Sequence, residues 1–149
     1  MATRRRFLFT LSALAGITLA GGVRAQAPAE REALLRQITG GAAVRPGRVT
    51  FDTPELADNG HAVPVRIAVD SPMTAADHVR SITVIAERNP RPIVAKFTLG
   101  AYSGRAQVVT RIRLADNQEV LALAQMSDGS YWMGGARVVV TELACLEGG

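Results

Sequence analysis

The sequence predicts a mainly β fold, a sandwich of about seven short strands with one short helix at its N-terminal end. Two observations lead to this prediction. Short segments in which apolar and polar residues alternate recur along most of the chain, which is typical of strands with one buried face. Groups of Gly, Pro, Asn and Asp separate these segments, as turns do. No long repeat or interdomain linker is visible, so one domain is expected.

The helix is expected near the start of the mature chain. Residues 30–39 have helical spacing, and Gly40-Gly41 is expected to end the helix at its C-cap. The residues before the helix, 26–29, are expected to form a loose tail. Three apolar residues of the helix share one side: Leu34, Leu35 and Ile38.

The strands are expected between residues 49 and 143. In residues 63–69, Val and Ile alternate with Pro64, Arg66 and Ala68, which predicts a half-buried strand. The proline favours an edge strand or the start of a strand, because it cannot donate a backbone hydrogen bond. The other predicted strands are residues 49–51, 81–87, 93–99, 105–114, 120–126 and 137–143.

Turn signals separate these strands. Asn59-Gly60 ends a predicted loop, and Asn89-Pro90-Arg91-Pro92 predicts a stiff turn. Ser127-Asp128-Gly129-Ser130 predicts a hairpin turn into Tyr131-Trp132-Met133. Gly134-Gly135 is then expected to separate that short segment from the last strand.

The N-terminal leader, residues 1–25, has the pattern of a cleaved bacterial signal peptide. Arginines come directly before the uncharged and largely apolar run Phe7 to Ala20, and small residues suited to cleavage follow at Val23-Arg24-Ala25. The run is too short to span a bilayer permanently. Arg4 and Arg5 resemble the twin-arginine pair of proteins that are exported in the folded state. We therefore expect a periplasmic protein that is exported by the twin-arginine route.

Removal of the leader changes the charge of the chain. Four of the 17 basic residues lie in the leader, so the 13 that remain equal the 13 acidic residues in number. The high pI of the whole sequence therefore does not indicate nucleic-acid binding. Aromatic residues are also too few to form a surface that stacks bases.

Cys145 is the only cysteine, and it lies close to the end of the sequence. It follows the last predicted strand, so it is expected on a short, accessible tail. A lone cysteine excludes an intrachain disulfide and, in an exported protein, indicates an intermolecular bond, a covalent adduct or a free thiol. On position alone, a chance cysteine near a terminus is equally compatible.

Other catalytic chemistry has little support. His61 and His78 are separated in the sequence and have neither a second cysteine nor patterned carboxylates near them, so no metal site is predicted. There is no nucleophile elbow, phosphate-binding loop or dinucleotide fingerprint, and no cofactor is expected.

Six segments, spread over nearly the whole mature chain, carry a resemblance to a known family: Asn59–Val65, Val69–Thr74, Ile85–Pro92, Ala95–Phe97, Thr110–Ala115 and Asp128–Trp132. Together they resemble the SoxY family, the sulfur-carrier subunits of the periplasmic thiosulfate-oxidising system. A twin-arginine signal also suits that family.

The resemblance implies a function for each part of the chain. Residues 26–143 would form an immunoglobulin-like β-sandwich that pairs with a SoxZ-like sandwich as a heterodimer. Residues 144–149 would form a carrier arm on which Cys145 holds thiosulfate-derived sulfur covalently while periplasmic enzymes dock transiently. The chain would thus be a carrier subunit and not an enzyme. Family members typically end in Gly-Gly-Cys-Gly-Gly, whereas this arm reads Ala-Cys-Leu-Glu-Gly-Gly.

The residues around the thiol agree with a carrier. Glu142 and Glu147 disfavour the thiolate, and no lysine or arginine lies nearer in sequence than Arg137. Such a thiol depends on a partner enzyme for activation.

Two alternatives belong to other classes. One is an immunoglobulin-like periplasmic module that binds proteins and carries no sulfur. The other is a thiol-dependent enzyme such as a peroxidase, which the lack of a second, resolving cysteine disfavours. For the carrier, we expect residues 105–126 to supply much of the contact with the partner subunit, because they are apolar at alternate positions.

Overall fold

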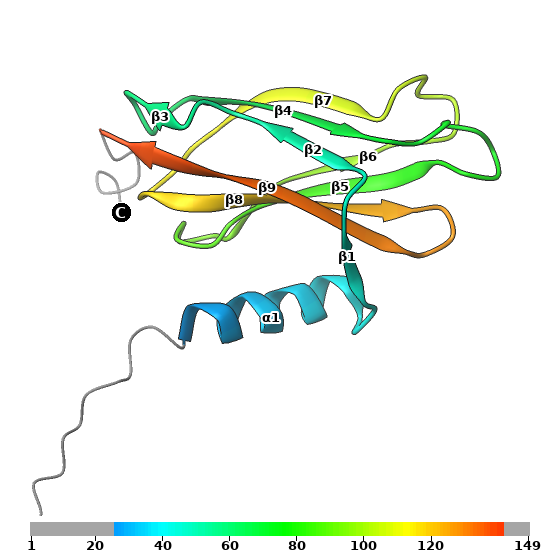
Figure 1. Ribbon diagram of the computed structural model, residues 1–149, viewed down its shortest axis with the longest axis horizontal. Helices are drawn as coiled ribbons and strands as arrows, with labels where there is room; N and C mark the ends of the chain where they lie inside the picture. The colour runs from blue at the N-terminus through cyan, green and yellow to red at the C-terminus, as the bar shows by residue number, and fades with distance from the viewer. Residues whose placement is uncertain (1–25, 142–149) are drawn as a thin grey trace, which may run out of the picture.

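Two β-sheets face each other in the structure, a computed structural model that describes residues 26–141 (Figure 1). The larger sheet has six strands, with the order β1–β9–β8–β5–β6 and with β3 beside the end of β9: β1 (Val44–Pro46), β3 (Leu56–Ala57), β5 (Val79–Ala86), β6 (Ile93–Thr98), β8 (Gln118–Met126) and β9 (Tyr131–Val140). The smaller sheet has three strands in the order β2–β4–β7: β2 (Val49–Asp52), β4 (Val63–Val69) and β7 (Gln107–Ile112). This is an immunoglobulin-like sandwich, and the mainly β prediction is confirmed.

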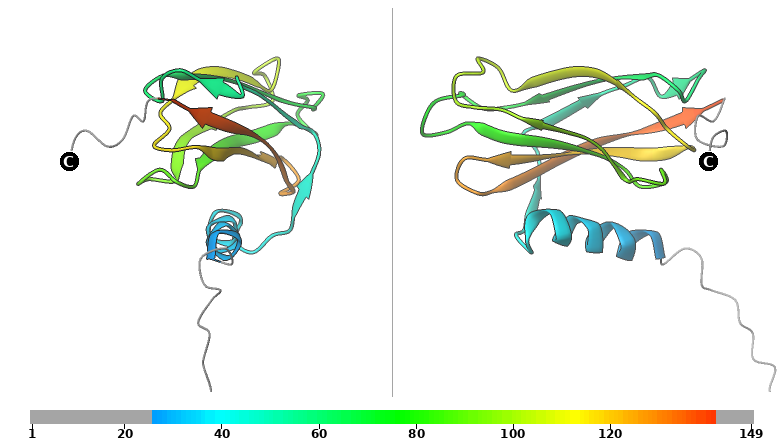
Figure 2. Two further views of the ribbon diagram at one scale, coloured as in Figure 1. Left: turned by 60° about the vertical axis from the view of Figure 1, so that its left-hand side comes forward. Right: turned by 180° about the vertical axis from the view of Figure 1, so that it is seen from behind.

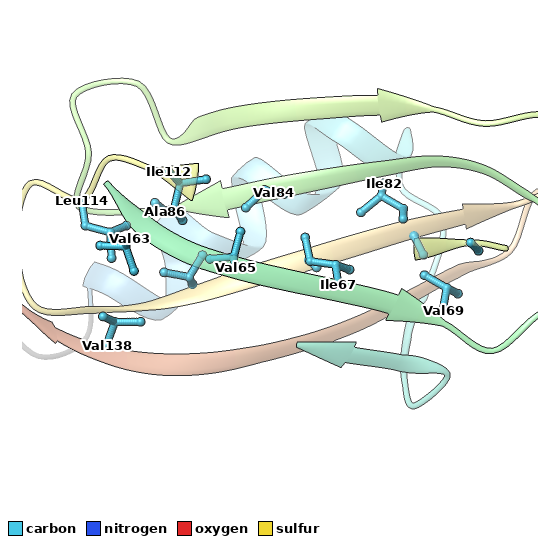
Figure 3. Close-up of a cluster of buried hydrophobic side chains, with 14 of the residues drawn as sticks. Val63, Val65, Ile67, Val69, Ile82, Val84, Ala86, Ile112, Leu114 and Val138 are labelled. Carbon is cyan, nitrogen blue, oxygen red and sulfur yellow. The ribbon is translucent and has the colours of Figure 1, made fainter. Parts of the chain in front are cut away.

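The core lies between the two sheets (Figure 3). Every second residue of β4 points into it, as the alternation predicts, and the same holds for Ile82, Val84 and Ala86 of β5. Val63, Ile67, Ile82 and Val84 are fully buried. The strands missing from the sequence prediction are β1 and β3, which are three and two residues long and are too short to show a period.

A helix covers the outer face of the larger sheet (Figures 1 and 2). This helix, α1, is Gln26–Thr39, so the predicted loose tail at residues 26–29 is wrong. Pro28 is compatible with helix there, because the first turn does not use its N–H groups for intrahelical hydrogen bonds. Gly40-Gly41 ends the helix as predicted, with positive φ at both residues and a hydrogen bond from Gly41 N to Arg36 O. Across residues 26–141, no helix has the length and apolar character needed to cross a membrane.

The contact between α1 and the sheet buries the second face of the central strands. The three apolar residues of α1 pack against Ile85, Leu121 and Leu123, each at most 2% exposed. Strands β5 and β8 are therefore buried on both faces. Within residues 105–126, which are expected to supply much of the partner contact, the chain itself covers both faces of β8, so that expectation stays a prediction for β7.

Two details of the strands differ from the sequence prediction. Gly134-Gly135 does not separate two segments as predicted. Strand β9 runs through both glycines and stays paired with β8 there. Strand β4 is central in its sheet, so the edge alternative for its proline is wrong, whereas Pro64 is the second residue of β4, as the alternative of a strand start predicts. The backbone pairing of β2 with β4 ends at Arg66, so no β2 residue needs a backbone N–H from Pro64. The carbonyl of Pro64 accepts a hydrogen bond from the side chain of Thr53, just after β2.

Candidate functional site

The predicted site residues Cys145, Arg4 and Arg5 lie outside the described residues. The structure does describe the end of β9 at Val140 and the following Thr141, which precede the predicted arm, residues 144–149. This end of β9, together with the loops that hold it, is called the arm root below.

Strand β3 holds one side of the arm root. It pairs in parallel with β9, so that Leu56 aligns with Val139. Val139 N donates to Glu55 O at 2.8 Å, and Thr141 N donates to Ala57 O at 3.1 Å. The Thr141 hydroxyl adds a hydrogen bond to Asp58 O at 2.6 Å. These bonds fix the backbone up to Thr141, so residues that follow start from a defined position.

A side chain holds the other side of the arm root. Val140 N donates to Asn117 Oδ1 at 2.7 Å, which satisfies an amide near the end of β9. Asn117 belongs to the turn before β8. Nothing in the sequence indicates that this asparagine caps a strand distant in sequence, so the contact could be found only from the fold.

Charged groups near this turn are paired. Arg88 donates to Asp116 Oδ2 at 2.8 Å, and the backbone N–H of Asn117 donates to the other carboxylate oxygen. Both hydrogen bonds, first that from Arg88, lower the pKa of Asp116. Further toward the helix, Arg31 binds Glu87 and Glu119, and the hydrogen bond to Glu87 is the main reason that the pKa of Arg31 is raised.

The surface beside the arm root is partly apolar. Leu56 is 58% exposed and Val139 is 38% exposed, and the two residues are aligned in the β3–β9 pair. A shallow pocket next to Val139 is also lined by Glu55 and Arg137. The arm root therefore presents two exposed apolar side chains with charged groups beside them.

The histidines lie far from each other. His61 is in the turn before β4, at the end of the sandwich that holds the arm root. Its backbone N–H donates to Asn59 Oδ1 at 2.7 Å. His78 comes directly before β5 at the opposite end, and its Nδ1 lies 3.0 Å from Thr74 O. Within the described part of the chain, no three His, Cys, Asp or Glu residues are grouped as metal ligands would be.

The comparisons with known proteins point to one family. The family model described as sulfur oxidation protein SoxY matches residues 35–145, a range that ends on the single cysteine. No curated protein matches the chain.

Solved structures show the same fold. The sulfur carrier protein SoxY from Chlorobium limicola f thiosulfatophilum is 23% identical, with a TM-score of 0.64, and the match covers 76% of this chain and 98% of that one. Superoxide reductase (neelaredoxin) from Ignicoccus hospitalis is 17% identical, with a TM-score of 0.56, and the match covers 63% and 80% of the two chains. At these identities the likeness concerns the fold and not the chemistry.

Proposed function

The chain belongs to the SoxY family of sulfur oxidation proteins, and on that basis we propose that it is a covalent sulfur carrier. Cys145 holds thiosulfate-derived sulfur and presents it to sulfur-oxidising enzymes of the periplasm. The observation that carries this proposal is the family match over residues 35–145, which reaches the only cysteine of the chain.

The chemistry of loading explains why a carrier needs an enzyme. When a thiol and thiosulfate join, an S–S bond forms, and one proton and two electrons leave. The chain has a single cysteine, so it cannot form an internal disulfide that would accept those two electrons. The loading enzyme must therefore accept them. This chain then acts as the carrier and is not itself an enzyme.

The arm root supports the proposal through the reach of the chain. Only Ala144, Leu143 and Glu142 separate Cys145 from Thr141, so an extended arm brings the cysteine at most about 14 Å beyond Thr141. An enzyme that binds the sulfur adduct must therefore approach the sandwich closely. The exposed Leu56 and Val139 are the apolar surface that such an enzyme meets beside the arm root.

The export route and the partner complete the proposal. Arg4 and Arg5 direct twin-arginine transport of the folded chain, which lets a SoxZ-like subunit without its own signal cross the membrane as the second half of a heterodimer. Replacing the arginines at positions 4–6 with lysine keeps the positive charge that the general secretory route uses. We expect the triple variant to disappear from the periplasm in fractionation, and unchanged periplasmic levels would contradict this route.

The test of function is the variant Cys145→Ser. Mass spectrometry of the protein from cells grown on thiosulfate should show sulfur adducts on the wild-type chain and none on the variant. Thiosulfate-dependent respiration should stop, while the variant keeps its fold by circular dichroism. Normal thiosulfate oxidation by the serine variant would show that the chain is a binding module and not a sulfur carrier.

A further inference from the structure

An open groove runs between two edge strands, one from each sheet, on one side of the sandwich. Strand β6 is the last strand of the larger sheet, and β7 is the last strand of the smaller one. The groove, called the β6–β7 groove below, has an apolar part formed by Ile93, Val94 and Ile112. Its rim carries Arg91, Arg111 and Arg113, all exposed.

The rim is positively charged with no acidic residue to balance it. No carboxylate lines the groove, and within residues 26–141 none lies within ion-pair distance of these three arginines. Since the mature chain has equal numbers of basic and acidic residues, this is a local excess of positive charge. It favours a negatively charged binding partner.

Hydrogen bonds hold the groove open before anything binds. The Asn89 side chain donates to Arg113 O at 2.7 Å and accepts from Ala115 N at 2.8 Å. Gln118 Nε2 adds a hydrogen bond to the same oxygen of Asn89 at 3.1 Å. The turn that leads into β6 is thereby attached to the chain that follows β7, so one end of the groove is already formed.

The pairing of β4 with β7 shows which backbone groups of β7 are free. Val69 N donates to Ala106 O, so the odd-numbered residues of β4 direct their backbone groups toward β7. By register, Val108, Thr110 and Ile112 receive these bonds. The backbone N–H and C=O groups of Gln107, Val109 and Arg111 therefore point away from the sheet.

The two free strand edges are not equally open. Strand β6 has a bulge in its pairing with β5, follows a proline at position 92 and carries Lys96, all features that discourage further pairing. Strand β7 keeps a regular register over its whole length and contains no proline. Its Val109 is 70% exposed, which leaves apolar surface beside the open edge.

We propose that the β6–β7 groove binds an extended segment of a partner protein in which acidic and apolar residues alternate. The segment adds to the smaller sheet as a fourth strand, beside β7. Its backbone bonds to the outward groups of Gln107, Val109 and Arg111, its acidic side chains pair with the arginines of the rim, and its apolar side chains cover Ile93 and Ile112. A second copy of this chain fits less well, since it would bring the same positive rim to the groove. The inference does not depend on sulfur transport by Cys145.

A labelled peptide of about ten residues, in which valine and glutamate alternate, tests the proposal with the full mature chain. We expect binding by fluorescence anisotropy that weakens about tenfold in the double variant Arg91→Glu/Arg111→Glu. The double variant Arg45→Glu/Arg80→Glu changes the net charge equally but away from the groove, and it should bind as the wild type does. The same peptide with lysine in place of glutamate should not bind. Equal loss in both double variants would overturn the proposal.

Amide exchange measured by NMR locates the peptide independently. On binding, Val109 and Arg111 should gain protection, whereas Val108 and Thr110 are already bonded to β4 and should change little. The variant Val109→Pro removes an outward N–H that β4 does not use, and it should abolish binding while the β4–β7 amides stay protected. Protection confined to β2 or β6 would place the peptide elsewhere and overturn the assignment.

Three further results would assign the groove to another occupant and so contradict the proposal. Tighter peptide binding after removal of residues 142–149 would show that the chain's own acidic arm fills the groove. A dimer in sedimentation that the groove variant dissociates would show a second copy there. Displacement of the peptide by thiosulfate, but not by chloride at equal ionic strength, would show a small-anion site.

Discussion

At the scale of single residues, Gly134 and Gly135 allow β9 to pass close to its neighbours. A Cβ atom on Gly134 would lie 2.3 Å from the carbonyl oxygen of Val49, in the facing sheet. A Cβ atom on Gly135 would lie 2.7 Å from the carbonyl oxygen of Val120. Both obstacles are backbone atoms, which cannot rotate away. The glycines are therefore required for close packing and do not mark a turn.

The first prediction concerns this packing. Gly134→Ala should lower the free energy of unfolding by about 2 kcal/mol, because β2 and β9 must move apart to admit the methyl group. Urea denaturation of the mature chain measures this change. Gly100→Ala is the control: its Cβ would meet nothing within 4 Å, so it should change stability by less than about 0.5 kcal/mol. Equal stability of the two variants would contradict the close approach of the strands.

The second prediction concerns Asp116, whose pKa is held below the usual value by Arg88 and by the N–H of Asn117. A pKa lowered by folding means that the carboxylate stabilises the fold above its unfolded-state pKa, and that this stabilisation is lost as the pH falls through the folded-state pKa. Asp116→Asn should therefore be less stable than wild type at neutral pH. The side chain is 45% exposed, so the difference should stay below about 1 kcal/mol.

Urea denaturation across a pH series checks the sign of the effect. The difference between Asp116→Asn and wild type should close as the pH falls below about 3.8, the ordinary value for aspartate. A difference that persists unchanged in acid would show that the Arg88 contact does not act through the charge of Asp116.

At the scale of elements, β9 is the strand that leads to the arm root, and its neighbours hold it along its length. It is paired on both sides, with β8 along its length and with β1 and β3 at opposite ends. This pairing ends beside Asn117 and Thr141, which hold the arm root. A strand fixed in this way gives the residues after Thr141 a constant starting point.

The third prediction concerns this attachment. Asn117→Ala removes the acceptor for Val140 N and should cost about 1 kcal/mol, with faster hydrogen exchange at the Val140 amide. Asn117→Asp keeps an acceptor oxygen in place and should preserve slow exchange. If the Val140 amide exchanges at the same rate in all three proteins, Asn117 does not hold the end of β9.

The sequence predicts the long elements of this fold and misses the short ones for a physical reason. Strand β4 shows period two because one of its faces is buried, whereas β5 and β8 are apolar over most of their length because both of their faces are buried. Strands β1 and β3 form only because β9 offers hydrogen bonds to segments that have no pattern of their own. The same holds for the candidate site. Its cysteine can be found in the sequence, whereas the contacts that hold the arm root join residues distant in sequence and can be found only in the fold. The true extent of α1 was also hidden, because the proline at position 28 resembles a break.

At the scale of the whole molecule, the two outer faces of the sandwich differ. Helix α1 covers the larger sheet, whereas no element among residues 26–141 covers the smaller one (Figure 2). Among residues 26–141, the surface left for partners is therefore the outer face of the smaller sheet, the arm root and the side where β6 and β7 end the sheets. Apolar alternation alone does not distinguish a strand such as β8, which the chain's own helix buries, from one that another protein buries.

The last prediction concerns the role of α1 as this cover. Leu35 packs against the buried cluster that Ile85 forms with its two β8 neighbours, so Leu35→Asp should detach the helix and lower the free energy of unfolding by about 1–3 kcal/mol. Detachment exposes the apolar face of β5 and β8, so the variant should bind the dye ANS and self-associate in sedimentation. Ala33→Asp introduces the same charge at an exposed position of the same helix and should do neither. If both variants remain monomeric and equally stable, the central strands do not depend on α1, and their outer face would then be available to a partner after all.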